Sequence, residues 1–302
     1  MTEPIGRPRV LITGGDGQLG WELARAFAPL GEVFAFDRAA LDLLDADAIR
    51  ARCREVRPSL ILNAGAYTAV DKAEHEPEIA IRINGEAPGI LAEEANRVGA
   101  PLIHYSTDYV FDGNAHAPYR EDDATAPQSV YGHSKLAGEH AVITTAQQYL
   151  IFRTSWLYGN RRQNFMLTIL RLARERETLR IVADQVGSPT WVRPVSDTTA
   201  ACVTATPTAL NIGIPSGIYH LSAAGQTSWH GFATAILENT TDPSRRATRV
   251  EAIATADYPT PARRPAYSVL SHDKLQSATG IAPLDWREHL AGCLAERKGM
   301  KH

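Results

Sequence analysis

The residues best suited to chemistry are a tyrosine and a lysine four positions apart, Tyr131 and Lys135. Within a helix, residues at this spacing share one face, so the phenol and the ammonium are expected to lie close together. A free phenol has a pKa of about 10, and a neighbouring ammonium favours the phenolate and lowers that pKa. The pair therefore predicts a tunable proton donor, and the lysine could also hold the ribose of a nicotinamide nucleotide. A surface Tyr–Lys pair is the alternative, because this spacing also occurs by chance.

Thr107 and Asp108 follow an apolar run at residues 102–105 that predicts a buried strand. The Thr107 hydroxyl could hydrogen-bond a substrate carbonyl oxygen, or it could satisfy its own backbone. Asp108 could bind a sugar hydroxyl or cap a turn, and the residues alone do not separate these roles.

Three glycines, Gly14, Gly17 and Gly20, lie between a predicted strand at residues 10–13 and a predicted amphipathic helix. Their spacing is a relative of the dinucleotide fingerprint G-x-G-x-x-G. A tight turn without Cβ atoms lets backbone N–H groups approach a pyrophosphate at the helix N-terminus. An ordinary glycine-rich turn is the alternative, but the strand before it and the helix after it favour nucleotide binding.

Asp37 and Arg38 stand at the end of the second predicted strand, about twenty residues beyond the glycines. A carboxylate at this place can accept both ribose hydroxyls of an adenosine, or it can cap a turn. An arginine beside it can hold a 2′-phosphate. We therefore expect NADPH to be the preferred cofactor and NADH also to be accepted.

These residues need a scaffold that gathers strand ends, and the first half of the chain predicts one. Short apolar runs alternate there with helical patterns; the runs are residues 10–13, 33–36, 60–62, 102–105 and 150–152, and the patterns are residues 45–57, 78–98 and 131–148. Strands and helices that alternate in this way build right-handed units and a parallel sheet. Ligands of such sheets bind at the carboxyl ends of the strands, where the candidate residues fall. The expected fold class is α/β, a doubly wound parallel sheet of the Rossmann type.

In the second half of the chain the alternation weakens, and the loops become longer and richer in proline. A late strand at residues 217–221 is expected to return to the sheet. We expect a dinucleotide-binding domain at residues 1–155 and 195–224. The remaining residues, 156–194 and 225–302, are expected to form a smaller, discontinuous substrate-binding domain.

The composition is that of an ordinary globular chain of 302 residues, 44% hydrophobic and 22% charged, with a net charge of -3. This balance does not favour a nucleic-acid or membrane-surface partner. No apolar run reaches the length of a transmembrane helix, and residues 1–9 lack the apolar core of a signal peptide, so we expect a cytoplasmic protein. Cys53, Cys202 and Cys293 are far apart and lack metal-ligand spacing, which predicts reduced thiols and no metal site.

Taken together, the glycine repeat, the strand-end motif at residues 106–113 and the Tyr131-x-x-x-Lys135 pair resemble the extended short-chain dehydrogenase/reductases. Four further stretches narrow the resemblance: residues 63–74, 152–156, 184–190 and 258–265. With them, the chain is similar to the dTDP-4-dehydrorhamnose reductase family over residues 10–286 or so.

The resemblance implies NAD(P)H-dependent reduction of the C4 ketone of dTDP-4-dehydro-L-rhamnose, the last step of dTDP-L-rhamnose synthesis. It implies Tyr131 as the proton donor, Lys135 as its partner and ribose ligand, and Thr107 as the third member of the triad. Asp108 and Trp156 would face the sugar. The implied cofactor contacts are Gln18, Leu19, Asp37, Asp42, Leu43, Ala64, Gly65 and Ala66.

One departure from the family pattern concerns metal and assembly. The resemblance implies that several family members dimerise around Mg²⁺, which carboxylates hold. One of these carboxylates would belong to a glutamate three residues after the Pro-Thr that ends the motif at residues 184–190. Arg193 stands at that place here, and a cation repels Mg²⁺. We therefore expect Mg²⁺ to play no part, and the chain to be a monomer or a weak homodimer.

Other functions on the same fold remain alternatives. Nucleotide-sugar 4,6-dehydratases carry Thr-Asp-Glu at the strand end, whereas here Tyr109 follows Thr107 and Asp108, so the eliminating glutamate is missing. Another nucleotide-sugar reductase or epimerase is a second alternative. A third is a non-catalytic, NADP-binding regulatory subunit, since the β subunit of methionine adenosyltransferase resembles this family and keeps much of its motif set.

Overall fold

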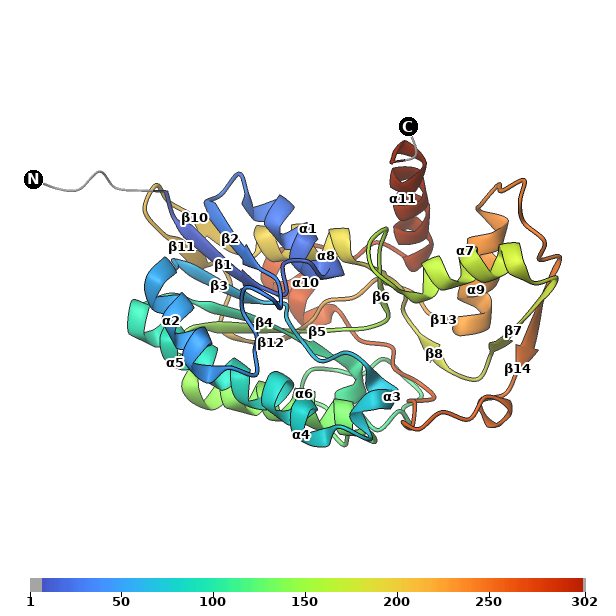
Figure 1. Cartoon of the computed structure of the whole chain (residues 1–302), viewed down its shortest axis with the longest axis horizontal. Coiled ribbons are helices and arrows are strands. Elements are labelled where there is room, and N and C mark those ends of the chain that lie inside the picture. Colours follow the sequence, from blue (N-terminus) through green and yellow to red (C-terminus); the bar gives the residue numbers. More distant parts are fainter. Residues whose placement is uncertain (1–6, 301–302) are drawn as a thin grey trace, which may run out of the picture.

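A six-stranded parallel sheet forms the centre of the computed structural model, which describes residues 7–300 (Figure 1). Its strands, in spatial order, are β2 (Glu32–Phe36), β1 (Arg9–Thr13), β3 (Leu60–Asn63), β4 (Leu102–Thr107), β5 (Tyr149–Thr154) and β12 (Gly217–His220). The order reverses at β1, which pairs with β2 on one side and β3 on the other. In open sheets of this kind, the crevice for a ligand opens at that reversal, beyond the carboxyl ends of the strands.

The central strands are apolar on both faces because helices cover both. Residues 10–12 of β1 and 60–62 of β3 are fully buried, which is the pattern that a parallel sheet between two helical layers requires. One layer holds α1 (Gln18–Phe27), α8 (Val192–Ala201) and α10 (Asp273–Thr279). The other holds α2 (Ala46–Val56), α5 (Ala87–Val98) and α6 (Val130–Thr145). Before α5, the chain forms the short helices α3 (Val70–Ala73) and α4 (Pro77–Ile81) and the π-helical turn η1 (Arg82–Glu86).

A second, smaller body lies beyond the carboxyl ends of the strands (Figure 1). Its core is built from α7 (Phe165–Glu175), α9 (Trp229–Glu238) and α11 (Trp286–Gly299) around buried side chains such as Met166 and Phe232. Short two-stranded ladders complete the fold: β7 (Thr178–Val182) with β14 (Arg249–Ile253), β8 (Val186–Gly187) with β13 (Thr227–Ser228), β6 (Leu157–Tyr158) with β9 (Thr190–Trp191), and β10 (Val203–Ala205) with β11 (Leu210–Ile212). Two single 3₁₀ turns, η2 (Asp108–Val110) and η3 (Thr255–Asp257), lie in loops.

The doubly wound sheet predicted from the sequence is confirmed, and β12 is the late strand that returns to it. One packing detail differs from the expected division of the chain. Helix α10 falls in the range assigned to the smaller domain, yet its Leu275 is buried in the same cluster as the helices over the sheet. Among residues 7–300, no helix is long and apolar enough to cross a bilayer.

Candidate active site

A cleft of about 720 Å³ runs along the carboxyl ends of β1, β3, β4 and β5 and reaches the second body. The predicted site residues that line it are Gly14, Gly17, Gln18, Leu19, Arg38, Asp42, Leu43, Ala64, Gly65, Ala66, Thr107, Asp108, Tyr131, Lys135 and Trp156. Residues far apart in the sequence therefore meet in one place, at the reversal of strand order where a nucleotide is expected. Gly20 and Asp37 do not line the cleft.

Glycines let two turns approach each other at the floor of this cleft. Gly14 has a left-handed backbone with φ of +66°, and a Cβ there would lie 2.8 Å from the Cα of Gly65. Gly20 has a different reason to be glycine, because a Cβ on it would collide with the carbonyl of Gly14. The close approach leaves backbone N–H groups at the start of α1 facing the cleft, which suits a diphosphate.

The end of β2 provides the charged residues expected to read an adenosine ribose. The Asp37 carboxylate is exposed and accepts a hydrogen bond from the Ala40 amide at 2.8 Å, so in this structure it caps a turn. Arg38 lines the cleft, and its Nε lies 3.6 Å from a carboxylate oxygen of Asp42. The Arg38 guanidinium therefore lies at the edge of the cleft, where a ligand can reach it, whereas the Asp37 carboxylate is hydrogen-bonded to the nearby Ala40 amide.

Helix α6 carries Tyr131 and Lys135 in its first two turns. It begins at the Ser129 cap, whose hydroxyl accepts from the Gly132 amide at 3.1 Å. The Lys135 ammonium donates to the backbone carbonyl of Tyr105 at 2.6 Å, so it points to β4 rather than to the Tyr131 phenol. Burial lowers the pKa of Lys135 to about 8.

The predicted lowering of the Tyr131 pKa by the lysine is not found. Burial raises the pKa of Tyr131 well above its ordinary value, and Thr107 only partly offsets this. The physical reason is that the ring is withdrawn from water while the lysine charge is directed at a strand carbonyl. A phenol in this state stays protonated at ordinary pH, which is the form that can donate a proton.

A buried chain of hydrogen bonds joins the lysine to the turn at Gly65. The Gly65 amide donates to the Thr13 hydroxyl at 2.9 Å, and that hydroxyl donates to Asn63 Oδ1 at 2.7 Å. Asn63 Nδ2 lies 3.0 Å from His104 Nδ1, and His104 Nε2 lies 3.5 Å from Lys135 Nζ. Burial holds the pKa of His104 well below its usual range, so the imidazole is neutral. The chain therefore fixes the lysine and a cofactor-facing turn in one framework.

Polar groups without protein partners gather at the inner end of the cleft. The Thr107 hydroxyl donates to Asp108 Oδ1 at 2.9 Å, but Asp108 Oδ2 has no partner among residues 7–300. The buried hydroxyls of Ser106 and Thr154 are also without partners in the part of the chain that the structure describes. Burial raises the pKa of Asp108 to about 6. Because buried polar groups are normally paired, these atoms are available to bind water or the hydroxyl and carbonyl groups of a ligand.

The segment after η3 brings a cation that the sequence analysis gave no role. Arg264 lines the cleft; it donates to Asp71 Oδ2 at 2.7 Å and to the Tyr109 hydroxyl at 3.2 Å. Tyr109 in turn packs edge to face on Tyr131, with ring centroids 5.6 Å apart. The only sequence signal for Arg264 was the motif at residues 258–265 that contains it. No spacing in the sequence relates Arg264 to its contacts Asp71 and Tyr109.

A pair of stacked tryptophans closes the far wall of the cleft. Trp156 and Trp229 have ring centroids 3.4 Å apart and nearly parallel planes, at 4°. Trp156 also has a left-handed backbone, with φ of +46°, which is unusual for a bulky residue. Trp229 was missed by the sequence analysis, since a lone tryptophan at the start of α9 carries no recognisable spacing.

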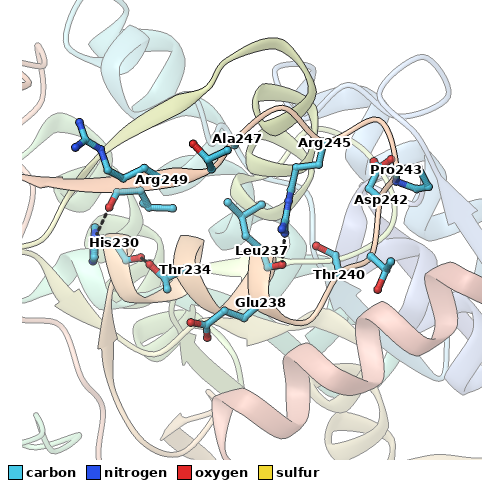
Figure 2. A pocket seen from close by; sticks show the side chains of 13 residues that line it. His230, Thr234, Leu237, Glu238, Thr240, Asp242, Pro243, Arg245, Ala247 and Arg249 are labelled. Carbon is cyan, nitrogen blue, oxygen red and sulfur yellow. Dashed lines mark hydrogen bonds between the residues drawn. The ribbon is translucent and has the colours of Figure 1, made fainter.

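A second hollow of about 740 Å³ lies away from these residues, between α9 and the loop that leads to β14 (Figure 2). Two of its polar side chains bond to neighbouring backbone: Arg245 donates to the Leu237 carbonyl at 2.7 Å, and Thr234 to the His230 carbonyl at 3.0 Å. None of the site residues predicted from the sequence lines this hollow. The cleft at the strand ends is therefore the candidate active site.

The position expected to replace a metal ligand lies on α8. The Arg193 guanidinium contacts the carboxylate of Glu22 on α1 at 3.1 Å and also that of Glu296 on α11. The Glu22 carboxylate also forms an ion pair with Arg25, whose Nε lies 2.7 Å from Oε2. Among residues 7–300, no group of three or more histidine, cysteine and acidic side chains is arranged to hold a metal ion.

Comparisons with known proteins were made against this fold and site. Residues 8–298 match the family model described as the RmlD substrate binding domain. A dTDP-4-dehydrorhamnose reductase from Burkholderia thailandensis is 47% identical over 293 residues, which cover 95% of this chain and 98% of that protein. One from Escherichia coli K12 is 45% identical over 288 residues, covering 92% and 94%. The crystal structure of dTDP-4-dehydrorhamnose reductase from Bacillus anthracis in complex with NADP has a TM-score of 0.86 and 36% identity, covering 96% of this chain and 99% of that one.

Proposed function

The chain belongs to the dTDP-4-dehydrorhamnose reductase family, and we propose that it reduces the C4 ketone of dTDP-4-dehydro-L-rhamnose to dTDP-L-rhamnose with a nicotinamide cofactor. The sheet body would bind the dinucleotide and the second body the sugar nucleotide, with the division at residues 1–155 and 195–224 against residues 156–194 and 225–302, except that α10 packs on the sheet body. Both ligands would then meet in the cleft between the two bodies.

One observation carries the proposal: a protonated, buried phenol and a set of unpartnered polar atoms share the inner end of a cleft that begins at a glycine turn. The glycine turn and the start of α1 suit a diphosphate, so a dinucleotide along the cleft would point its reactive end at Tyr131. When bound, the nicotinamide supplies the hydride for the ketone carbon.

The side chains divide the remaining work. Tyr131 donates its proton to the carbonyl oxygen as that oxygen gains charge, and general acid catalysis of this kind typically contributes about 10²–10⁴-fold. Thr107 turns its hydroxyl proton from Asp108 Oδ1 to the same substrate oxygen, and Asp108 Oδ2 accepts from a sugar hydroxyl. Lys135, held by the Tyr105 carbonyl, has further N–H groups with which it binds the cofactor ribose. Trp156 covers the sugar from the second body.

The finer choice of cofactor rests on Arg38. Its guanidinium is at the cleft edge, where it can bind a 2′-phosphate, so NADPH is preferred and NADH is also accepted. Arg38→Ala should lower the ratio of kcat/KM for NADPH to that for NADH, because a charge-assisted hydrogen bond contributes roughly 1.5–3 kcal/mol. An unchanged ratio would assign the phosphate to another residue.

The direct experiment is steady-state oxidation of NADPH and NADH with dTDP-4-dehydro-L-rhamnose generated in the assay. Cofactor oxidation that depends on this sugar, with dTDP-L-rhamnose as product, supports the proposal. Tight NADPH binding with no turnover would favour a regulatory subunit instead. Dehydration of dTDP-glucose would favour a 4,6-dehydratase, although Tyr109, hydrogen-bonded to Arg264, supplies no carboxylate for that elimination.

A further inference from the structure

Four cations line the cleft, and they are not equivalent. Arg38 lies at the end of β2, and Lys135 and Arg264 lie at the inner end with Tyr131 and Tyr109. Arg162 is the fourth, and it comes from the second body, in the loop between β6 and α7. It lies beside the glycine turn, at the place where the middle of a bound dinucleotide would be.

Several contacts fasten this loop across the cleft. Arg162 Nε donates to the backbone carbonyl of Asp16 at 2.8 Å, and Nη2 contacts the Asp16 carboxylate. Two residues on, Asn164 Nδ2 donates to Gln18 Oε1 at 2.9 Å. Asp16 and Gln18 belong to the glycine turn and the start of α1, so the loop is attached to the segment that faces a diphosphate.

The backbone of Arg162 is held in an uncommon conformation. Its φ is +58°, in the left-handed region that a long side chain seldom adopts. Such a conformation persists where surrounding contacts impose it, and it is often found at ligand sites. Here the contacts with Asp16 and the Asn164 cap at the start of α7 fix the loop on both sides of Arg162.

The charges of Asp16 and Arg162 bear on how a diphosphate would bind at this turn. A dinucleotide diphosphate carries two negative charges, whereas backbone N–H groups and a helix N-terminus offer only partial positive charge. Asp16 adds a full negative charge inside the same turn, 45% exposed, and this would repel the ligand unless a cation stood beside it. Arg162 is that cation, and a guanidinium that uses Nε and Nη2 still has a third nitrogen to donate.

We propose that Arg162 is a ligand of the cofactor diphosphate, carried across the cleft by the second body, an inference that rests on the function proposed above. It neutralises Asp16 and donates to a phosphate oxygen at the same time. Because the loop runs on into α7, cofactor binding fastens the two bodies together on either side of the sugar site.

The test compares dissociation constants of two probes, NADPH and adenosine 2′-monophosphate, which lacks the diphosphate. Arg162→Ala should weaken NADPH binding roughly tenfold, as loss of one charge-assisted hydrogen bond at a half-exposed site implies, and leave adenosine 2′-monophosphate unchanged. Arg38→Ala should weaken both probes. The matched control is Arg161→Ala, because the neighbouring Arg161 is turned onto the Trp21 ring, 3.7 Å away, and not into the cleft.

A second variant separates a direct contact from simple neutralisation. If Arg162 only cancels the charge of Asp16, then Asp16→Asn combined with Arg162→Ala restores wild-type NADPH affinity, and this would overturn the proposal. If Arg162 contacts the diphosphate, the double variant stays weak. Unchanged NADPH affinity in Arg162→Ala overturns the inference alone, whereas a wild-type protein that does not bind NADPH overturns the proposed function.

Discussion

Tyr131 is buried, so its pKa is raised and the phenol is kept in the protonated form that reduction of a ketone needs. Tyr131→Phe removes only that proton donor, and kcat should fall by about a hundredfold or more while the dissociation constant for NADPH stays nearly the same. Lys135→Met should impair both, because the lysine has a second role at the ribose. Single-turnover rates and cofactor titrations measure the two quantities, and a near-normal kcat in Tyr131→Phe would contradict the assignment.

The ionisation of Asp108 should make the stability of the fold depend on pH. Its pKa is raised to about 6 in the folded protein, above the unfolded value of about 3.8, so protonation favours folding below that lower value and the benefit is lost as pH rises through 6. Asp108→Asn cannot ionise, and it should therefore raise the free energy of unfolding at pH 8 by on the order of 2–3 kcal/mol relative to wild type.

This gain should shrink as pH falls from 8 to 4.5, and urea unfolding at both values measures it. The exposed Asp47→Asn is the control, since that side chain is 99% exposed and should show no such difference. The same Asp108→Asn change should raise KM for the sugar nucleotide, because an acceptor oxygen is lost. A gain in stability that is equal at the two pH values would contradict the ionised state at pH 8.

At the scale of elements, α6 is the part whose placement matters most, and a buried ion pair fixes it on the sheet. Arg153 of β5 contacts Glu139 of α6 through Nη2 at 2.7 Å and Nε at 3.0 Å, and the two side chains are 3% and 1% exposed. The Arg153 guanidinium also lies over the Phe111 ring, 5.1 Å from its centroid. The ion pair thus attaches α6, the helix that carries Tyr131 and Lys135, to β5.

Breaking this pair should be costly. Arg153→Met leaves Glu139 buried without its partner, so the free energy of unfolding should fall by about 3–5 kcal/mol. The double variant Arg153→Met with Glu139→Leu removes both charges and should recover much of the loss. Chemical denaturation of the three proteins measures this, and a double variant no more stable than Arg153→Met would show that the charges are not what holds α6.

At the scale of the whole molecule, the two bodies share a charged junction centred on Arg193. Arg193 lies between Glu22 and Glu296, which bring α1, α8 and α11 together, and a guanidinium keeps its charge at any ordinary pH. We predict that the protein is active after EDTA treatment and that its apparent mass does not depend on Mg²⁺.

Sedimentation with and without Mg²⁺, run beside the activity assay, tests both parts. The informative variant is Arg193→Glu, which places a third carboxylate beside Glu22 and Glu296 and should make the apparent mass respond to Mg²⁺. Wild-type activity that is lost on chelation and restored by Mg²⁺ would contradict the prediction.

Local sequence pattern was enough to predict the parallel sheet, its helical layers and the edge of the sheet where the candidate residues meet. Val10 to Gly20 encode a strand, a turn and a helix by local pattern alone, and alternation of such units allows few topologies other than a doubly wound sheet. Once the strands are parallel, their carboxyl ends meet at one edge, so Gly14, Gly65 and Thr107 had to come together. These inferences depend on residues that are close together in the sequence, and the periodicity of hydrophobic residues reports the secondary structure that such residues form.

Which groups each side chain meets became visible only when the folded arrangement was known. Lys135 points to the Tyr105 carbonyl and not to the phenol four residues before it, because the packing of α6 on the sheet brings that carbonyl within 2.6 Å of the ammonium. Arg162 reaches Asp16 and Trp229 stacks on Trp156 across long stretches of chain, and no spacing in the sequence relates such residues. Contacts of this kind arise when the second body folds back over the sheet, so their partners are set by packing and charge in three dimensions and not by local pattern.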